Sequence, residues 1–314
     1  KLICEKFKKD NNLDYAPEQV VVSCGAKHSI FNCLMALVSR EDEVLVPLPF
    51  WVSYPEMVNI CGGVVRFVKT TPKNNFKFTI KEIEKHLSPK TKVLILNSPS
   101  NPSGCVYAPG ELKEIARLCV ENKIFVISDE IYEKIIFDGQ KPVSIASLNS
   151  QIYELAITVN GLSKSYSMTG WRIGYLGGPR DIVDAISNLQ DHSTSNPASI
   201  SQKAAVAALS APDDFSKAIC AEFQKRRDYL ISRLKEIKDI SYTIPAGAFY
   251  IFCDISKTGL DSMAFAEKAL AEASVSLIPG KSFGMDDYVR ISFATGIEEI
   301  EKGVSRIKLW LDKI

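Results

Sequence analysis

The chain contains the stretch Gly161-Leu162-Ser163-Lys164-Ser165-Tyr166-Ser167-Met168-Thr169-Gly170-Trp171-Arg172-Ile173-Gly174. An apolar run at residues 155–159 precedes it and predicts a buried strand, and a second short apolar run follows at residues 173–176. Between these runs, Lys164 lies on a loop rich in Gly and Ser, eight residues before Arg172. A lysine amine attacks carbonyl carbon atoms, and an arginine fork matches a phosphate group. This loop is therefore suited to bind a cofactor that carries an aldehyde at one end and a phosphate at the other.

Length and composition are those of an ordinary globular enzyme. The 314 residues are enough for a large core and for two domains. The formal net charge is +1, which gives no support for a nucleic-acid partner or an anionic membrane surface. The sequence shows no apolar run long enough to span a bilayer and no secretory signal pattern.

The cysteines and histidines argue against disulfides and metal. The eight cysteines form no C-x-x-C pair, and several lie in apolar segments, which favours reduced core cysteines in a cytoplasmic protein. His28, His86 and His192 are the only histidines, so a His-based metal site is not expected.

The first two thirds of the chain alternate between strand-like and helix-like segments. Strands are predicted at residues 20–23, 43–46, 64–68, 93–96 and 124–128, and helices at residues 26–38, 54–60, 79–86 and 111–121. This alternation is typical of an α/β fold with a mostly parallel sheet between helices. Ligands of such sheets bind at the carboxyl ends of the strands.

The last third predicts a smaller α+β domain. Residues 212–237 have the pattern of one long amphipathic helix, strands are expected at residues 249–253, 275–278 and 289–292, and helices at residues 262–272 and from residue 297. We place the domain boundary near residue 205, which gives a large domain at residues 1–205 and a small one at residues 206–314. The chain starts with Lys1 inside a segment that already looks helical, so we expect a fragment or a trimmed chain.

Five further blocks contain residues suited to bind a ligand, and each has a plainer explanation. Gly25 lies between a strand and a helix start, where backbone N–H groups can approach a phosphate, although a tight turn explains it equally well. The aromatic loop around Trp51 and the turn at Asn101 could each be ordinary surface structure. Asp129 at a strand end is more often a helix cap. Arg290 in an apolar strand either faces solvent or needs a buried anionic partner.

The stretch from Gly161 to Gly174 closely resembles the lysine-attachment motif of the class I aminotransferases, which are fold-type I enzymes that use pyridoxal phosphate. That motif has small and apolar residues around the lysine and ends in an arginine, an apolar residue and Gly or Ala. The matching residues are Gly161, Leu162, Ser163, Lys164, Ser167, Met168, Arg172, Ile173 and Gly174. The resemblance covers the whole chain and is strongest to the bacterial aspartate aminotransferase branch.

This resemblance implies a role for each block. It implies that residues 1–205 form the domain that binds pyridoxal phosphate, with Lys164 as the attachment site and the catalytic base. It implies that the phosphate of the cofactor is bound by Gly25, Ala26, Lys27 and Arg172, and that Trp51 covers the face of the ring. The ring hydroxyl oxygen is implied to contact Asn101 and Tyr132, and the pyridine nitrogen to contact Asp129. The implied substrate-binding residues are Arg290, as a clamp on the α-carboxylate, with Lys27, Asn101 and Trp51.

The reaction implied is amino-group transfer between an amino acid and a 2-oxo acid, with aspartate and 2-oxoglutarate giving oxaloacetate and glutamate. Many aspartate enzymes have an arginine shortly before a Ser-Asn-Pro segment, but residues 191–197 contain none. In the branch that this chain resembles, a lysine at the position of Lys27 binds the distal carboxylate. A solvated helix-start lysine is the plainer explanation of Lys27.

Other activities stay open at this point. The same branch contains enzymes that accept prephenate, and related enzymes act on aromatic amino acids or alanine or are β-lyases. A catalytically silent module that binds pyridoxal phosphate is a further alternative. The family has an N-terminal segment ahead of the point where this chain starts, and it is usually dimeric with active sites at the subunit interface. We therefore expect a homodimer for the intact protein.

Overall fold

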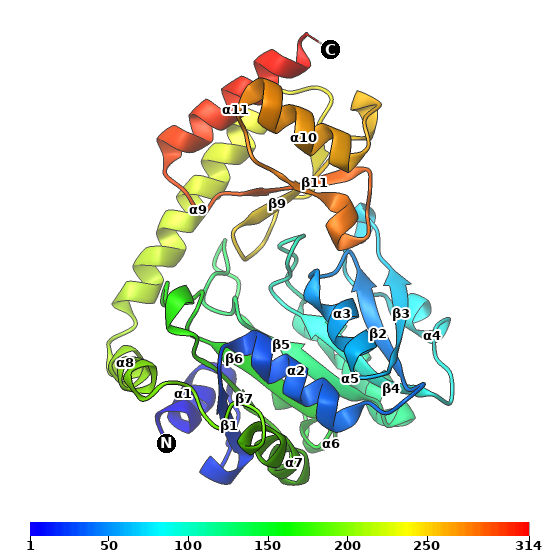
Figure 1. Cartoon of the computed structure of the whole chain (residues 1–314), viewed down its shortest axis with the longest axis vertical. Helices are drawn as coiled ribbons and strands as arrows, with labels where there is room; N and C mark the ends of the chain where they lie inside the picture. Colours follow the sequence, from blue (N-terminus) through cyan, green and yellow to red (C-terminus); the bar gives the residue numbers. More distant parts are fainter. Residues whose placement is uncertain (314) are drawn as a thin grey trace.

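The computed structural model describes residues 1–313 and contains two β-sheets (Figure 1). The first sheet has seven strands in the order β1-β7-β6-β5-β4-β2-β3. Their bounds are β1 (Val20–Ser23), β2 (Glu43–Leu48), β3 (Val64–Lys69), β4 (Thr91–Asn97), β5 (Phe125–Asp129), β6 (Ala156–Gly161) and β7 (Gly174–Gly177). The described helices of this part are α1 (Leu2–Asn11), α2 (Ala26–Leu37), α3 (Ser53–Ile60), α4 (Ile80–Glu84), α5 (Pro109–Asn122), α6 (Ser150–Tyr153), α7 (Arg180–Asp191) and α8 (Ser199–Ser210).

The predicted mostly parallel sheet is confirmed. Strand β7 pairs antiparallel with both of its neighbours, β1 and β6, whereas β2 to β6 pair in parallel. Strand β1 therefore runs in the same direction as β6. Because parallel strands end at the same edge of a sheet, the segments that follow β1, β2, β4, β5 and β6 meet there.

The sheet is covered on both faces, which explains its apolar strands. Along β4, Val93 and Ile95 pack with residues of α2, α3 and α7. Leu94 and Leu96 pack on the other face with residues of α1, α5, α6 and α8. Successive side chains of a strand point to opposite faces, so one apolar run supplies both cores.

The second sheet has the order β10-β11-β9-β8, and all of its pairings are antiparallel. Its strands are β8 (Ser241–Tyr242), β9 (Tyr250–Asp254), β10 (Ile278–Pro279) and β11 (Tyr288–Ser292). Helices α9 (Asp214–Leu234), α10 (Ser262–Ala273) and α11 (Ile297–Leu311) supply its core, and α9 runs along one side of the molecule from α8 to this sheet (Figure 1). The strand predicted at residues 275–278 is largely wrong, because only Ile278 and Pro279 reach a pairing position opposite β11.

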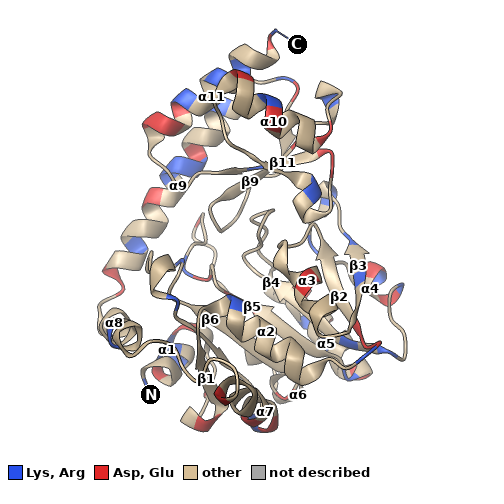
Figure 2. Ribbon diagram, viewed as in Figure 1, with Lys and Arg blue, Asp and Glu red and all other residues tan. Residues whose placement is uncertain are grey.

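Charges of both signs are interspersed along α9 and α11 (Figure 2). An ion pair from Arg233 Nε to Glu301 Oε2 at 2.8 Å joins the two helices, and Lys308 Nζ of α11 contacts Glu236 Oε2, just beyond α9, at 3.0 Å. No helix within residues 1–313 combines the length and apolar character that are needed to cross a membrane.

Candidate active site

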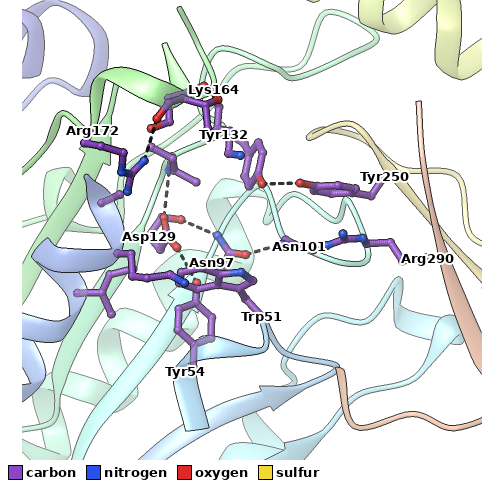
Figure 3. Close-up of a pocket in the computed structure, with 16 residues that line it drawn as sticks. Trp51, Tyr54, Asn97, Asn101, Asp129, Tyr132, Lys164, Arg172, Tyr250 and Arg290 are labelled. Atoms are coloured by element: carbon purple, nitrogen blue, oxygen red, sulfur yellow. Dashed lines mark hydrogen bonds between the residues drawn. The ribbon is translucent and has the colours of Figure 1, made fainter. Parts of the chain in front are cut away.

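A cavity of about 390 Å³ opens at the carboxyl edge of the seven-stranded sheet, between it and the second sheet (Figure 3). Its walls bring together residues from seven separate segments of the chain. The lining includes these residues predicted from the sequence: Ala26, Lys27, Trp51, Asn101, Asp129, Tyr132, Lys164, Arg172 and Arg290. Gly25 is outside this lining set, directly before α2.

Lys164 lies on the turn that follows β6 and is half-buried. Its Nζ is 5.8 Å from the ring centre of Tyr132 and 5.5 Å from that of Phe249. Burial lowers the pKa of Lys164, the positive charges of Arg290 and Arg172 lower it further, and Asp129 opposes them. A lysine whose pKa is depressed in this way offers more neutral amine, which is the form that reacts with a carbonyl and accepts a proton.

Asp129 is the last residue of β5 and is almost fully buried. Its Oδ2 accepts a hydrogen bond from the Tyr54 hydroxyl at 2.6 Å, and its Oδ1 accepts one from the Ile131 N–H at 3.2 Å. Burial raises the pKa of Asp129, while these hydrogen bonds and Lys164 act in the opposite direction. Among residues 1–313 no cation forms an ion pair with this carboxylate, so the site is suited to a ligand group that carries a positive charge or a proton.

The opposite wall of the cavity is suited to an anion. Helix α2 starts here with no side-chain cap, which leaves the first N–H groups of the helix, at Ala26 and Lys27, without an intrahelical partner. The Arg172 guanidinium is close by, donating to the Thr169 and Cys24 carbonyls at 3.0 and 3.4 Å. Gly25 has a φ of +92°, and a Cβ there would lie 2.2 Å from Arg172 Nη2, so only glycine fits this turn.

Arg290 reaches the cavity from β11. Its Nη1 donates to Asn101 Oδ1 at 2.8 Å, and its guanidinium lies 4.2 Å from the ring centre of Tyr250. Burial lowers the pKa of Arg290, and within the described chain its buried Nε has no hydrogen-bond partner. Since a buried guanidinium with an unused donor is unfavourable, this group is well placed to bind an anionic ligand. The contact also turns the Asn101 amide so that its Nδ2 donors stay available.

Trp51 and Lys27 form one corner of the cavity. Lys27 Nζ lies 4.9 Å from the centre of the Trp51 ring, in a cation–π contact, and Lys27 is exposed. The indole and the Tyr54 ring are nearly perpendicular, with ring centres 5.2 Å apart. The flat face of Trp51 and the mobile charge of Lys27 are therefore near the same opening.

Tyr54, Asn97 and Tyr250 are among the lining residues that had not been assigned from the sequence. The hydroxyl groups of Tyr250 and Tyr132 are 3.0 Å apart, which links β9 to the turn after β5 (Figure 3). Tyr54 holds Asp129, and Asn97 donates to the Asp129 carbonyl at 3.0 Å while accepting from the Asn101 N–H at 2.8 Å. The only sequence signal was weak, because Tyr54 belongs to the aromatic block around Trp51 and Asn97 directly precedes the turn that contains Asn101.

Comparisons with known proteins point to one family. Residues 1–307 match the family described as aminotransferase class I and II. The aspartate aminotransferase of Bacillus sp. (strain YM-2) is 43% identical over 310 residues, which cover 97% of this chain and 79% of that protein. A protein of Rickettsia conorii (strain ATCC VR-613 / Malish 7) named probable aspartate/prephenate aminotransferase is 44% identical over 323 residues, covering 99% of this chain and 80% of that protein.

Solved structures agree with these relatives. The aspartate aminotransferase of Rhizobium meliloti has a TM-score of 0.96 at 36% identity, and the match covers 99% of this chain and 80% of that one. The aromatic aminotransferase of Pyrococcus horikoshii OT3 has a TM-score of 0.96 at 38% identity and covers 99% of this chain and 84% of that one. The family predicted from the lysine motif is thereby confirmed.

Proposed function

Because this chain belongs to the class I and II aminotransferases, we propose that it transfers the amino group of aspartate to 2-oxoglutarate, forming oxaloacetate and glutamate. Enzymes of this family use pyridoxal phosphate and act on amino acids and 2-oxo acids. The observation that carries the proposal is one cavity whose walls bring together a lysine of lowered pKa, a buried carboxylate and two arginines.

The residues of the cavity fit the cofactor at each of its functional groups. Lys164 would hold its aldehyde carbon, and Arg172 with the start of α2 would hold its phosphate. Asp129, which has no cation partner within residues 1–313, would face the pyridine nitrogen, and Trp51 would cover the ring. A separate set would donate to the ring hydroxyl oxygen: Tyr132 and the Nδ2 of Asn101. When bound, pyridoxal phosphate supplies an electron sink for cleavage of the substrate Cα–H bond.

The chain's own residues then orient the substrate and move its proton. Arg290 binds the α-carboxylate with a bidentate fork and so fixes the direction of the Cα–H bond. Lys164 Nζ would accept the proton from Cα and hold it for delivery to the cofactor carbon, because a proton given back to Cα would only regenerate the starting amino acid. Its lowered pKa gives Lys164 more neutral amine than a fully solvated lysine has at the same pH. Tyr250, which stacks on the Arg290 guanidinium, holds this arginine toward the cavity.

The preference for substrates with two carboxylates is supported by a second cation at the site, Lys27, in addition to Arg290. Lys27 is exposed at the cavity mouth, where it can reach a distal carboxylate while Arg290 holds the α-carboxylate. An aromatic or prephenate substrate is the second candidate, since relatives with these names are equally similar and Trp51 offers an aromatic face. An alanine-type enzyme or a catalytically silent module that binds pyridoxal phosphate is less well supported, because the site contains both cations and a complete set of reacting groups.

We extend the proposal to assembly and location. Residues 206–314 would move as one domain against residues 1–205, with the contacts of Arg290 with Asn101 and of Tyr250 with Tyr132 joining the two. A homodimer is supported by apolar side chains exposed on α8 and α9, at Ile200, Val206 and Phe215. The eight cysteines are all free, which favours the reducing cytoplasm.

The direct test is the absorption spectrum of the chain loaded with pyridoxal phosphate, before and after aspartate is added. We expect a band of lysine-bound cofactor that aspartate converts to the band of the amine form, followed by its return with 2-oxoglutarate. Phenylalanine, prephenate and alanine are tested in parallel. A band that no amino acid changes would support the silent module, and faster conversion by phenylalanine would support the aromatic alternative.

Replacing Lys27 by alanine is expected to lower kcat/KM for aspartate about tenfold, the effect of losing one solvent-screened charge-assisted hydrogen bond. The value for phenylalanine should change less than threefold, since that substrate has no distal carboxylate. Steady-state kinetics with both donors measure the difference. Lys92→Ala is the matched control, because Lys92 forms a similar cation–π contact with Phe125, at 5.5 Å, outside the cavity. Equal losses for the two donors would remove Lys27 from substrate selection.

A further inference from the structure

We infer that Glu130 is a positioning residue, through which helix α1 holds the turn that carries Asp129 and Tyr132 at the cavity. The roles of Asp129 and Tyr132 rest on the proposed function, but the hold on the turn does not. Glu130 is itself outside the cavity lining.

Asp129 and Glu130 are neighbours whose side chains leave the sheet on opposite sides. Asp129 contacts Tyr54 of α3, on one face. Ser128 and Glu130, two residues apart and so on the other face, are joined by a hydrogen bond from Ser128 Oγ to Glu130 Oε1 at 2.8 Å. A rotation of the backbone at residue 130 would therefore move the Asp129 carboxylate as well.

Glu130 is anchored by three side-chain donors from three segments. Its Oε1 also accepts from Ser144 Oγ at 2.8 Å, and its Oε2 accepts from Asn11 Nδ2 at 3.0 Å. Its backbone N–H donates to the Val159 carbonyl at 2.9 Å. Both ends of this residue are thus fixed, to β6 through the backbone and to α1 through the carboxylate.

The far side of the turn is held by the same helix. Asn11 Nδ2 donates a second hydrogen bond, to Glu133 Oε2 at 2.7 Å, and its Oδ1 accepts from Lys6 Nζ at 2.7 Å. Lys6 also forms an ion pair with Glu133. The Glu133 N–H donates to the Glu130 carbonyl at 2.9 Å, which closes the turn around Tyr132. Asn11 therefore bridges Glu130 and Glu133, the residues on both sides of the Ile131–Tyr132 pair.

Burying these charged and polar side chains costs desolvation free energy. Lys6, Asn11, Glu130 and Glu133 are each less than a tenth exposed, and burial of two carboxylates beside one lysine carries a large desolvation penalty. Burial, with the charge of Glu133, raises the pKa of Glu130 to about 7 against the serine hydrogen bonds and Lys6. An apolar contact would fill the space at lower cost but would not fix the direction of the turn, whereas a set of directional hydrogen bonds does.

The first experiment uses the chain without cofactor, at pH 8, where Glu130 is ionised. Glu130→Gln keeps the shape of the side chain but removes its charge and one acceptor oxygen, so the hydrogen bonds from Ser128, Ser144 and Asn11 lose their charged acceptor. We expect amide hydrogen exchange of residues 130–133 to rise about tenfold, the factor for one lost hydrogen bond to a charged group, with no change in the strands β2 and β3. The matched control is Glu43→Gln, since Glu43 is equally buried and is held by Arg66 and Ser88 at the opposite end of the sheet. Unchanged exchange at residues 130–133 would overturn the inference whatever the protein's activity.

The second experiment follows the pH titration of the bound cofactor's absorption band. Tyr132, placed to donate to the ring oxygen, lowers the proton affinity of that oxygen and of the adjoining lysine nitrogen. If Glu130→Gln displaces Tyr132, the midpoint pH of the absorption titration should therefore rise by about one pH unit, a tenfold change in proton affinity. Removal of the Glu130 charge alone would lower the midpoint instead. A midpoint that is unmoved or lowered would contradict a positioning role.

Asn11→Ala provides a second variant that leaves the charge and residues 128–133 unchanged. We expect the same direction of change in both experiments, because the two hydrogen bonds that Asn11 donates go to Glu130 and Glu133. If neither measurement differs from the parent chain, α1 has no hold on the turn and the inference fails. If the parent chain itself shows no cofactor band, the proposed function fails, and the exchange experiment still decides whether Glu130 fixes the turn.

Discussion

Replacing Lys164 by alanine is expected to lower kcat by at least about 10⁴-fold, the upper range for a lost general base. The residue is placed to serve twice, as the amine that would hold the cofactor and as the base that moves the Cα proton. Burial depresses the pKa of Lys164, and the guanidinium groups of Arg290 and Arg172 depress it further, while Asp129 acts in the opposite direction. The measurements are single-turnover kinetics with aspartate and the spectrum of the loaded chain.

A second variant separates the charge of Lys164 from its chemistry. Lys164→Arg retains a positive charge, but a guanidinium stays protonated and neither attacks the aldehyde nor accepts the proton. We expect it to be as inactive as Lys164→Ala and to lack the band of lysine-bound cofactor. Activity within tenfold of the parent in either variant would move the reacting amine to another residue.

Replacing Asp129 by asparagine is expected to reduce kcat about 10³-fold, the range for a lost preorganised electrostatic contact. Asparagine has the same shape and can still accept from the Tyr54 hydroxyl, but it does not stabilise a proton on the ring nitrogen. Without that proton the cofactor is a poorer electron sink. Steady-state kinetics with aspartate measure the loss.

The loss of activity in Asp129→Asn should not be accompanied by a loss of folding stability. Burial raises the pKa of Asp129 in the folded chain, so the stability that this carboxyl contributes is present at low pH and is lost as pH rises through the folded pKa. At pH 8 the cofactor-free Asp129→Asn chain should therefore melt at the same temperature as the parent or higher.

Asp138→Asn is the control, because its expected effects on melting temperature and on kcat are the reverse of those of Asp129→Asn. Arg227 holds Asp138 by two hydrogen bonds of 2.7 Å and lowers its pKa, so loss of this charge should lower the melting temperature at pH 8 without changing kcat. A parallel fall of kcat and melting temperature in Asp129→Asn would mean that Asp129 is structural.

Local sequence was enough to predict most of the elements. Strand β1 and helices α2 and α11 lie within a residue or so of their predicted starts, because apolar periodicity and Gly25 are local signals. The lysine motif could be recognised for the same reason, because the buried strand and the Gly- and Ser-rich loop that follows it lie within one short segment. The strand expected at residues 275–278 failed because β propensity needs a partner strand, and of residues 275–279 only Ile278 and Pro279 pair with β11.

What the sequence by itself determined was therefore the alternation of elements, the family and the residue types that follow the strand ends. The tertiary structure alone decided which distant groups complete the site: Tyr54 on Asp129, Tyr250 on Tyr132, and Arg290 on Asn101, 189 residues away. The same holds for the buried contact of Asn11 with Glu130. The physical reason is that propensities and turns depend on neighbours along the chain. Hydrogen-bond partners and desolvation depend on what packing places nearby, and no local pattern encodes that.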